Sequence, residues 1–122
     1  MDSQQTPLNP VEVEQQIRNL SNRIAKGVEV YSKRLSEFYE ADRDFDRAYS
    51  AAYLSAEGSI KDREHHATLA TIELREARDV AEVAYKYADR LAKALESQLR
   101  AMQSIGASVR AMYGVAGRGE GA

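Results

Sequence analysis

The chain has 122 residues, enough for one domain, and combines 43% hydrophobic with 30% charged residues. It contains no Cys, no Trp, two Pro and seven Gly, which excludes disulfides, thiolate metal sites, cysteine nucleophiles and a turn-rich β-fold. The sequence has no apolar run that could span a membrane and no signal-peptide pattern at its N-terminus. We therefore expect a soluble cytoplasmic protein that makes no contact with a membrane.

The first predicted helix begins at Asn9 and Pro10, because Asn9 can cap a helix and Pro10 suits its first position. Apolar and aromatic residues then recur every three or four positions, which is the spacing of one helix face. The members of this stripe are Ile17, Leu20, Ile24, Val28, Tyr31, Leu35, Phe38, Phe45, Tyr49, Ala52 and Ala56. Gly27 lies inside the run and permits a bend, but the pattern predicts a helix that continues to about Ala56.

A turn is predicted at residues 57–60, because Gly58 can adopt the left-handed conformation that ends a helix and Ser59 can cap the next helix. A second apolar stripe follows the turn and predicts a second long helix that ends near Tyr113. The members of this stripe are Leu69, Ile72, Ala77, Val80, Ala84, Tyr87, Leu91, Leu95, Leu99, Met102, Ile105, Val109 and Met112.

Two long helices joined by a short turn must fold antiparallel, so the sequence predicts an all-α, coiled-coil-like helical hairpin over residues 9–113. Residues 1–8 are predicted to be disordered, and the Gly-rich residues 114–122 are predicted to form a flexible tail. A lone hairpin cannot cover every aromatic residue of the first stripe, so we expect self-association into a helical bundle or ring. The candidate residues of this homo-oligomer interface are Tyr31, Leu35, Phe38, Phe45, Tyr49, Leu91, Leu95, Leu99 and Met102.

The net charge of −2 conceals an uneven distribution along the chain. Residues 15–36 carry five Lys or Arg and one Glu, and residues 97–119 carry three Arg and no acid. Between them, residues 37–82 carry six Lys or Arg and twelve Asp or Glu. A hairpin that turns near Gly58 brings the two basic segments together at its open end, where they would attract a phosphate backbone.

This charge pattern predicts non-specific binding of single-stranded nucleic acid through its phosphates, because no element resembles a motif that enters a groove. Tyr31 and Tyr113 lie near the same end of the predicted hairpin and can stack on unpaired bases. The candidate nucleic-acid-binding residues are Arg18, Arg23, Lys26, Lys33, Arg34, Arg100 and Arg110.

Other interpretations of the same pattern remain open. The protein can be a coiled-coil adaptor or scaffold that binds another protein through an aromatic face formed by Phe38, Phe45, Tyr49 and Tyr53. It can also be a sponge that holds a small nucleotide between protomers, as some phage counter-defence proteins do. Charged residues on a helix are, moreover, often only its solvated face.

Motifs for catalysis or metal binding are not evident in the sequence. Asp62 and His66 can share one face of a helix, but two ligands do not make a structural metal site. The acidic residues within 40–46 lie on successive helix faces, so they do not form a converging carboxylate pair. No Gly-rich phosphate loop, nucleophile elbow or dinucleotide fingerprint occurs. We therefore expect no catalytic residue, no enzymatic activity, no metal and no cofactor.

Over residues 37–113 the chain resembles small all-helical proteins encoded by tailed phages, especially phages of actinobacteria. The resemblance is carried by residues 52–67 (AYLSAEGSIKDREHHA), a Gly-Ser turn before a charged helix start, and by residues 99–113 (LRAMQSIGASVRAMY), a Gln-Ser segment before a basic end. Genes of this group commonly lie in the replication and recombination block of phage genomes. By analogy, the chain is also similar to the recombination mediator of T-even phages, an oligomeric helical protein. The resemblance implies binding of single-stranded DNA, a recombinase or single-strand-binding protein as partner, and the bacterial host cytoplasm as location.

Overall fold

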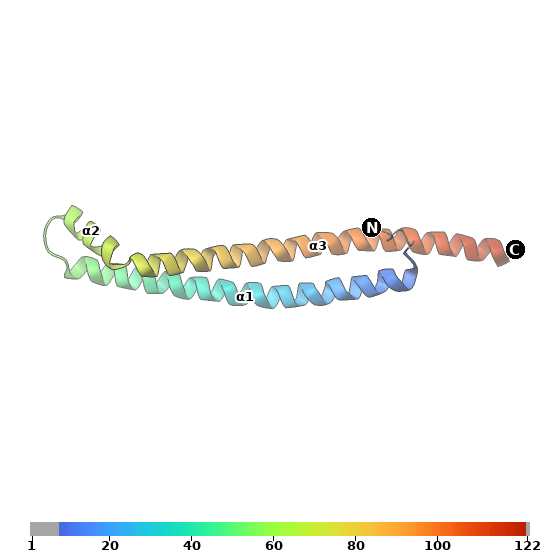
Figure 1. Ribbon diagram of the computed structural model, residues 1–122, viewed down its shortest axis with the longest axis horizontal. Coiled ribbons are helices and arrows are strands. Elements are labelled where there is room, and N and C mark those ends of the chain that lie inside the picture. Colours follow the sequence, from blue (N-terminus) through green and yellow to red (C-terminus); the bar gives the residue numbers. More distant parts are fainter. Residues whose placement is uncertain (1–7, 122) are drawn as a thin grey trace, which may run out of the picture. The chain divides into compact units, whose positions relative to one another are not determined.

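The computed structural model describes residues 8–121, and this part of the chain contains three helices and no strand (Figure 1). The helices are α1 (Pro10–Ser55), α2 (Ile60–Ala70) and α3 (Ile72–Gly121). The fold is therefore all-α, which confirms the predicted class. None of these helices has an apolar stretch long enough to cross a membrane.

The start of α1 is capped by Asn9. Its side-chain Oδ1 accepts a hydrogen bond of 2.9 Å from the backbone N–H of Glu12, which would otherwise be one of the unpaired donors at a helix start. From Pro10 the helix continues without interruption through Gly27 to Ser55. The glycine that permits a break therefore does not produce one.

The connection between α1 and α2 turns at Gly58, whose φ of 104° lies in the left-handed region. Ser59 and Asp62 then form a reciprocal capping box. The N–H of Asp62 donates to Oγ of Ser59, and the N–H of Ser59 donates to Oδ2 of Asp62, each over 3.1 Å. This is the segment in which the sequence predicts the turn.

The second predicted helix is interrupted at Thr71, which separates α2 from α3. The Thr71 side chain is buried, and its hydroxyl donates a hydrogen bond of 2.7 Å to the carbonyl oxygen of Ala67. The backbone N–H of Thr71 bonds instead to Thr68, over 3.3 Å. In a continuous helix, the carbonyl of Ala67 would accept the N–H of Thr71 itself. Here the Thr71 hydroxyl takes that carbonyl instead, so the prediction of one continuous helix is wrong at this point.

At its other end, α3 continues to Gly121, past Tyr113, where the sequence predicts the helix to end. Once a long helix is formed, each added residue gains a hydrogen bond without a new nucleation cost, and no Pro stops it. The segment 114–121 is therefore helical and not the predicted tail. The predicted disordered residues 1–8 lie outside the described part of the chain, except for Leu8.

The chain divides into two compact units, which are described separately. Unit 1 comprises Met1–Gly27 and Leu91–Ala122, and unit 2 comprises Val28–Arg90. In each unit a segment of α1 packs against a segment of α3, and unit 2 also contains α2 and the turn.

The core of unit 1 is aliphatic: the side chains of Val13, Leu20 and Leu95 are 1%, 8% and 4% exposed. Gly106 marks a close approach of α3 to α1, because a Cβ built there would lie only 2.9 Å from Cγ1 of Val13. A second contact joins Gly27 to the α3 segment, since a Cβ at Gly27 would lie 3.9 Å from Cβ of Ala92. Residue numbers rise on α1 as they fall on α3, so the two segments are antiparallel.

Unit 2 is held by aromatic and charged side chains in addition to the buried Ala67 and Ala88. The ring of Tyr85 on α3 lies between two rings of α1, with centroids 6.4 Å from Tyr31 and 5.1 Å from Phe38. These separations are typical of tilted and edge-on aromatic pairs, which prefer such geometries to face-to-face stacking.

Candidate nucleic-acid interface

Five of the seven candidate cations lie in unit 1, on two segments that are far apart in the sequence. Arg18, Arg23 and Lys26 belong to α1, and Arg100 and Arg110 belong to α3. All five side chains are exposed. The folding of unit 1 therefore brings these five residues of the two basic segments into one unit, as expected for a hairpin.

The register of unit 1 specifies which of these cations are neighbours along the helices. The close approaches at Gly106 and Gly27 fix the antiparallel alignment of the two segments. By that alignment, Arg100 lies level with the part of α1 between Arg18 and Arg23. The three side chains are therefore within about one helical turn of the same level.

The contacts of these cations within the chain are weak. Nη2 of Arg18 lies 3.9 Å from Oε1 of Glu14, and both side chains are at least 70% exposed. Nη2 of Arg100 donates to Oγ of Ser97 over 3.3 Å. Exposed ion pairs of this kind contribute about 0–1 kcal/mol, so Arg18 can exchange its carboxylate partner for a phosphate at small cost.

Arg110 differs from the other cations of unit 1 because its side chain lies against the packing contact. Its Nη1 is 3.3 Å from the position that a Cβ on Gly106 would take. The guanidinium therefore covers the glycine at which α3 approaches α1. A charge reversal at Arg110 would disturb this packing, so it is a poor choice for testing charge alone.

The cations of α1 do not form a single stripe. At about 100° per residue, Arg18 and Arg23 are about 140° apart around the helix, with Lys26 between them. A phosphate backbone that follows one face of unit 1 would contact only some of these side chains. The three cations of α1 are therefore spread over more than a third of the helix circumference.

Lys33 and Arg34 belong to unit 2, so they are not grouped with the other five candidates. Both side chains are exposed. Nη1 of Arg34 donates to Oε1 of Glu37 over 3.0 Å, an i,i+3 ion pair on the helix surface. The sequence groups them with the basic segment of α1, whereas the packing assigns them to the other unit.

The two units carry opposite net charges. Unit 1 contains seven Lys or Arg and five Asp or Glu, and unit 2 contains ten and fourteen, so their net charges are +2 and −4. The net charge of unit 1 is therefore positive, but it is smaller than the two basic segments alone suggest. Three acidic residues of the same unit reduce its positive charge, namely Glu12, Glu14 and Glu96.

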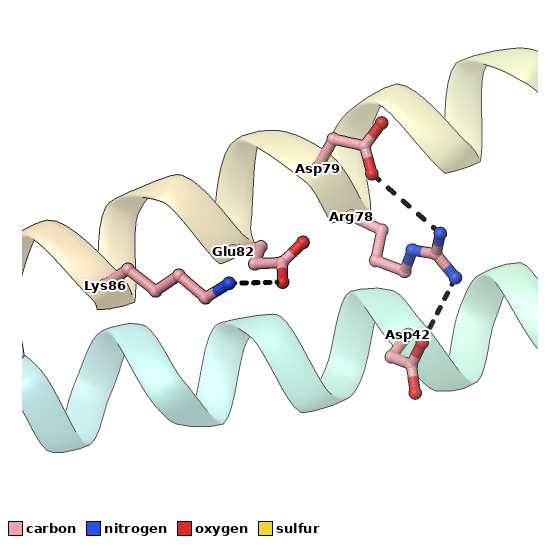
Figure 2. Close-up of polar contacts among 5 residues, drawn as sticks. All are labelled: Asp42, Arg78, Asp79, Glu82 and Lys86. Carbon is pink, nitrogen blue, oxygen red and sulfur yellow. Dashed lines mark ion pairs between the residues drawn. The ribbon is translucent and has the colours of Figure 1, made fainter.

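Charges in unit 2 are used to join its own helices (Figure 2). Nη1 of Arg78 on α3 lies 3.5 Å from Oδ1 of Asp42 on α1, and Nη2 lies 3.9 Å from Oδ1 of Asp79. The guanidinium also lies 4.6 Å from the centroid of the Phe45 ring, a cation–π contact. The apolar spacing gives no signal for Arg78, which directly follows Ala77 of the predicted stripe.

One further ion pair of unit 2 lies along α3. Nζ of Lys86 is 2.9 Å from Oε2 of Glu82, and both side chains are substantially exposed (Figure 2). The hydrogen bond to Glu82 and its negative charge raise the pKa of Lys86 above its ordinary value. This pair links successive turns of one helix and does not join α3 to α1.

The candidate residues of the oligomer interface differ in how much their own chain covers them. Leu95 is buried within unit 1, whereas Leu91 is 44% exposed. The other seven candidates are half-buried, namely Tyr31, Leu35, Phe38, Phe45, Tyr49, Leu99 and Met102. Much of this stripe therefore serves the contact between α1 and α3, which leaves less of it for a second copy.

The two tyrosines proposed for base stacking are in different situations. Tyr113 lies on α3 in unit 1, with 52% of its surface exposed. Tyr31 lies in unit 2, is half-buried and contacts the ring of Tyr85. Only Tyr113 therefore shares a unit with the five grouped cations.

The aromatic face of the adaptor interpretation is half-buried in unit 2. Part of it lines an open hollow of about 460 Å³, together with polar residues of α1, α2 and α3. The lining residues are Phe45, Asp46, Tyr49, Ser50, Thr68, Arg75 and Arg78. Because the lining combines arginines with an aspartate and Arg78 already contacts Asp42, the hollow does not select clearly for an anionic nucleotide.

The residues considered for metal binding have another role. Asp62 accepts the N–H of Ser59 in the capping box at the start of α2, and His65 and His66 are exposed on the same helix. Within residues 8–121, no three His, Asp or Glu side chains lie close enough to hold a metal ion together.

The exposed side of α3 carries apolar residues that form an outer stripe, and the sequence pattern does not separate this outer stripe from the buried residues. The members of this outer stripe are Val80, Val83 and Tyr87 in unit 2 and Ile105 and Met112 in unit 1. Their exposed fractions range from 41% to 69%. Around the helix, Val80 and Tyr87 lie about a quarter of a turn from the buried Ala88, and Ile105 and Met112 lie about a quarter of a turn from the buried Leu95. Val83 lies farther round, about 140° from Ala88. Steps of three and four fit both stripes, so the sequence pattern merges them.

No protein-family model matches the chain, and searches of curated proteins and of solved structures found no match. The charge, exposure and packing of the two units are therefore the basis for a functional argument. Among them, the exposed cations of unit 1 form the feature with the clearest chemistry, since exposed guanidinium and ammonium groups bind phosphates.

Proposed function

We propose that this protein is a self-associating helical accessory protein that binds single-stranded nucleic acid without sequence specificity. Its resemblance to small helical phage proteins suggests replication or recombination as the process in which it acts. The observation that supports the binding proposal is the gathering of Arg18, Arg23 and Lys26 with Arg100 and Arg110 in one unit, all exposed.

Binding would proceed by neutralisation of phosphates and release of condensed counterions. Each phosphate contact on a single strand contributes about −0.7 to the slope of log K against log salt, so affinity would fall steeply as salt rises. The net charge of −4 on unit 2 would repel the strand and orient it towards unit 1. Tyr113 can add stacking on a base, worth about 1–3 kcal/mol, without selecting a sequence.

A matched pair of charge-reversal variants tests this proposal. Arg23→Glu/Arg100→Glu changes unit 1, and Arg43→Glu/Arg47→Glu makes the same change of net charge in unit 2. All four side chains are exposed, so the fold should be kept. Binding is measured by fluorescence anisotropy of a labelled single-stranded oligonucleotide across a range of salt concentrations.

The unit 1 variant should lose about tenfold or more in affinity at low salt, and its salt slope should be smaller by about 1.4, for two lost contacts. The unit 2 variant should lose much less affinity than the unit 1 variant, because its altered side chains make none of the proposed phosphate contacts. Equal losses in the two variants, or no binding by the natural protein at low salt, would overturn the proposal and favour a protein-binding adaptor.

A further inference from the structure

Unit 2 repeats the Asp42–Arg78 combination one helical turn farther along, but the repeat is not a closed ion pair. Asp46 lies one turn after Asp42 on α1, and Arg75 lies one turn before Arg78 on α3. Because the two segments are antiparallel in unit 2, Asp46 and Arg75 are at about the same level. The first pair is in contact over 3.5 Å, whereas in the second pair neither side chain forms a hydrogen bond or an ion pair with any described residue.

These two opposite charges line the open hollow of unit 2, which has a volume of about 460 Å³. The half-buried ring of Tyr49 lies in the same lining, with the hydroxyls of Ser50 and Thr68. Within the described part of the chain, neither of these two hydroxyls forms a hydrogen bond. The volume falls within the range of roughly 300–1,000 Å³ that is typical of sites for small ligands. The hollow therefore offers one ligand an anion, a cation and an aromatic ring.

A second hollow adjoins the first one along α1. It has a volume of about 330 Å³ and shares Tyr49 and Ser50 with the first hollow, and its other lining residues are Tyr53 and Leu54. Leu54 is 79% exposed, so an apolar group placed here would cover a side chain that its own unit leaves open to water. The two hollows together have one charged end and one apolar end.

We propose that the two adjoining hollows of unit 2 bind a free α-amino acid with an aromatic side chain. Its ammonium group donates hydrogen bonds to the Asp46 carboxylate, and its carboxylate accepts from the Arg75 guanidinium, as charge-assisted bonds. Its ring lies on Tyr49 and extends towards Leu54. This site belongs to unit 2, so it does not depend on the cations of unit 1 or on nucleic-acid binding.

The pair of charges favours a zwitterion over a ligand of one sign. A purely anionic ligand such as a nucleotide would bring its charge near Asp46, and a purely cationic ligand would bring its charge near Arg75, each of which is unfavourable. Arg78 also lines the hollow, but its guanidinium is already held between Asp42 and the Phe45 ring (Figure 2). Arg75 is therefore the cation that is available for the carboxylate.

Four probes that differ by one group each test which parts of the ligand are recognised. L-phenylalanine has all three groups, hydrocinnamate lacks the ammonium, phenethylamine lacks the carboxylate and glycine lacks the ring. Each probe is titrated into the isotope-labelled full chain without nucleic acid, and binding is followed by NMR chemical shifts. L-phenylalanine should bind with saturation, and each of the other three probes should bind about tenfold more weakly or worse, because each loses one contact.

Two substitutions in the hollow should change the choice among these probes. Asp46→Asn should weaken L-phenylalanine by about tenfold and leave hydrocinnamate at least as strong, because only the ammonium loses its partner. Arg75→Gln should weaken L-phenylalanine and hydrocinnamate but not phenethylamine. Asp44→Asn and Arg43→Gln make the same changes of charge at exposed positions outside the lining and should alter nothing. Circular dichroism checks that each variant keeps its helices.

Several outcomes would overturn the inference. If L-phenylalanine causes no saturable shift, the hollows are not an amino-acid site. Hydrocinnamate that binds as tightly as L-phenylalanine indicates an anion site, and N-acetylphenylalanine amide that does so indicates a peptide segment of another protein. Equal effects of the hollow variants and their controls also contradict the assignment. Since none of these titrations contains nucleic acid, their failure is distinguishable from a failure of the oligonucleotide titration.

Discussion

Unit 1 and unit 2 both pair a segment of α1 with a segment of α3, but they hold the pair with different side chains. Unit 1 relies on aliphatic packing around Val13 and Leu95 and on the close approach at Gly106. Unit 2 relies on the ring of Tyr85 and on Arg78, which contacts a carboxylate and an aromatic ring of α1. The comparison shows that one helical arrangement can be stabilised by shape in one place and by electrostatics in another.

The same contrast applies to the charged residues that face solvent. In unit 1 the arginines have weak contacts with other side chains, such as the 3.9 Å pair of Arg18 with Glu14. In unit 2 Arg78 is engaged between helices and its side chain is only 27% exposed. Charges that contribute to packing are less available for a ligand, so Arg78 is a poor candidate for phosphate binding.

The largest effect should follow from removing the aliphatic core of unit 1. Leu95→Ala leaves a cavity beside α1 and should reduce the free energy of unfolding by about 2–4 kcal/mol. Denaturant unfolding at a fixed protein concentration measures the loss. The control is Val28→Ala, which truncates a 55% exposed side chain and should change stability by less than about 0.5 kcal/mol. Equal losses would show that Leu95 is not a core residue.

Two glycine substitutions in unit 1 should change the free energy of unfolding in opposite directions. Gly106→Ala adds a Cβ that would lie 2.9 Å from Cγ1 of Val13, so the buried Val13 side chain or the helix backbones must shift, and a net loss of about 1 kcal/mol is expected. Gly27→Ala meets only Cβ of Ala92 at 3.9 Å, an ordinary contact, and should gain about 0.5–1 kcal/mol from helix propensity. Thermal unfolding compares the two. A gain in both variants would contradict the close packing at Gly106.

Salt concentration should affect the stability loss of a unit 2 variant more than that of a unit 1 variant. Arg78→Ala in unit 2 removes the ion pair with Asp42 and the contact with Phe45, with an expected loss of about 1 kcal/mol at low salt. High salt should reduce that loss, because it screens the pair. The loss caused by Leu95→Ala should be nearly independent of salt. Arg47→Ala, at a 76% exposed side chain, is the control for a general effect of removing an arginine.

The smallest effect concerns the pH dependence of unit 2. Because the pKa of Lys86 is raised by Glu82, their pair is fully present below the ordinary lysine pKa and is lost as pH rises through the raised value. Titration of the Lys86 side chain by NMR should show this raised pKa, and Glu82→Gln should return it to the ordinary range. Global stability should hardly change, since the side chains of Lys86 and Glu82 are both substantially exposed. An unchanged pKa in Glu82→Gln would contradict the assigned cause.

Local signals in the sequence were sufficient where a backbone group or a neighbouring residue decides the structure. Asn9 caps α1, Gly58 takes the left-handed turn conformation and Ser59 forms the capping box, each within a few residues of its partners. The apolar spacing of α1 also indicated its packed side, with Gly27 replacing Val28 at one step. These features depend on hydrogen bonds and periodicity that are contained in short segments of the chain.

Other features depend on which surfaces meet, and the sequence could not specify them. The break at Thr71 follows from a side-chain hydrogen bond at a buried position, and the outer stripe of α3 has the same spacing as the buried one. The division of the candidate cations between two units likewise follows from packing.

The sequence by itself therefore determined an all-α chain, the start and the turn of its hairpin, and the presence of two basic segments. Only the tertiary structure decided which face of α3 is covered, which cations share a unit and which arginine joins two helices. The physical reason is that capping and periodicity act over one or two helical turns. Burial and charge neighbourhood, in contrast, are properties of two helix segments that come from distant parts of the chain.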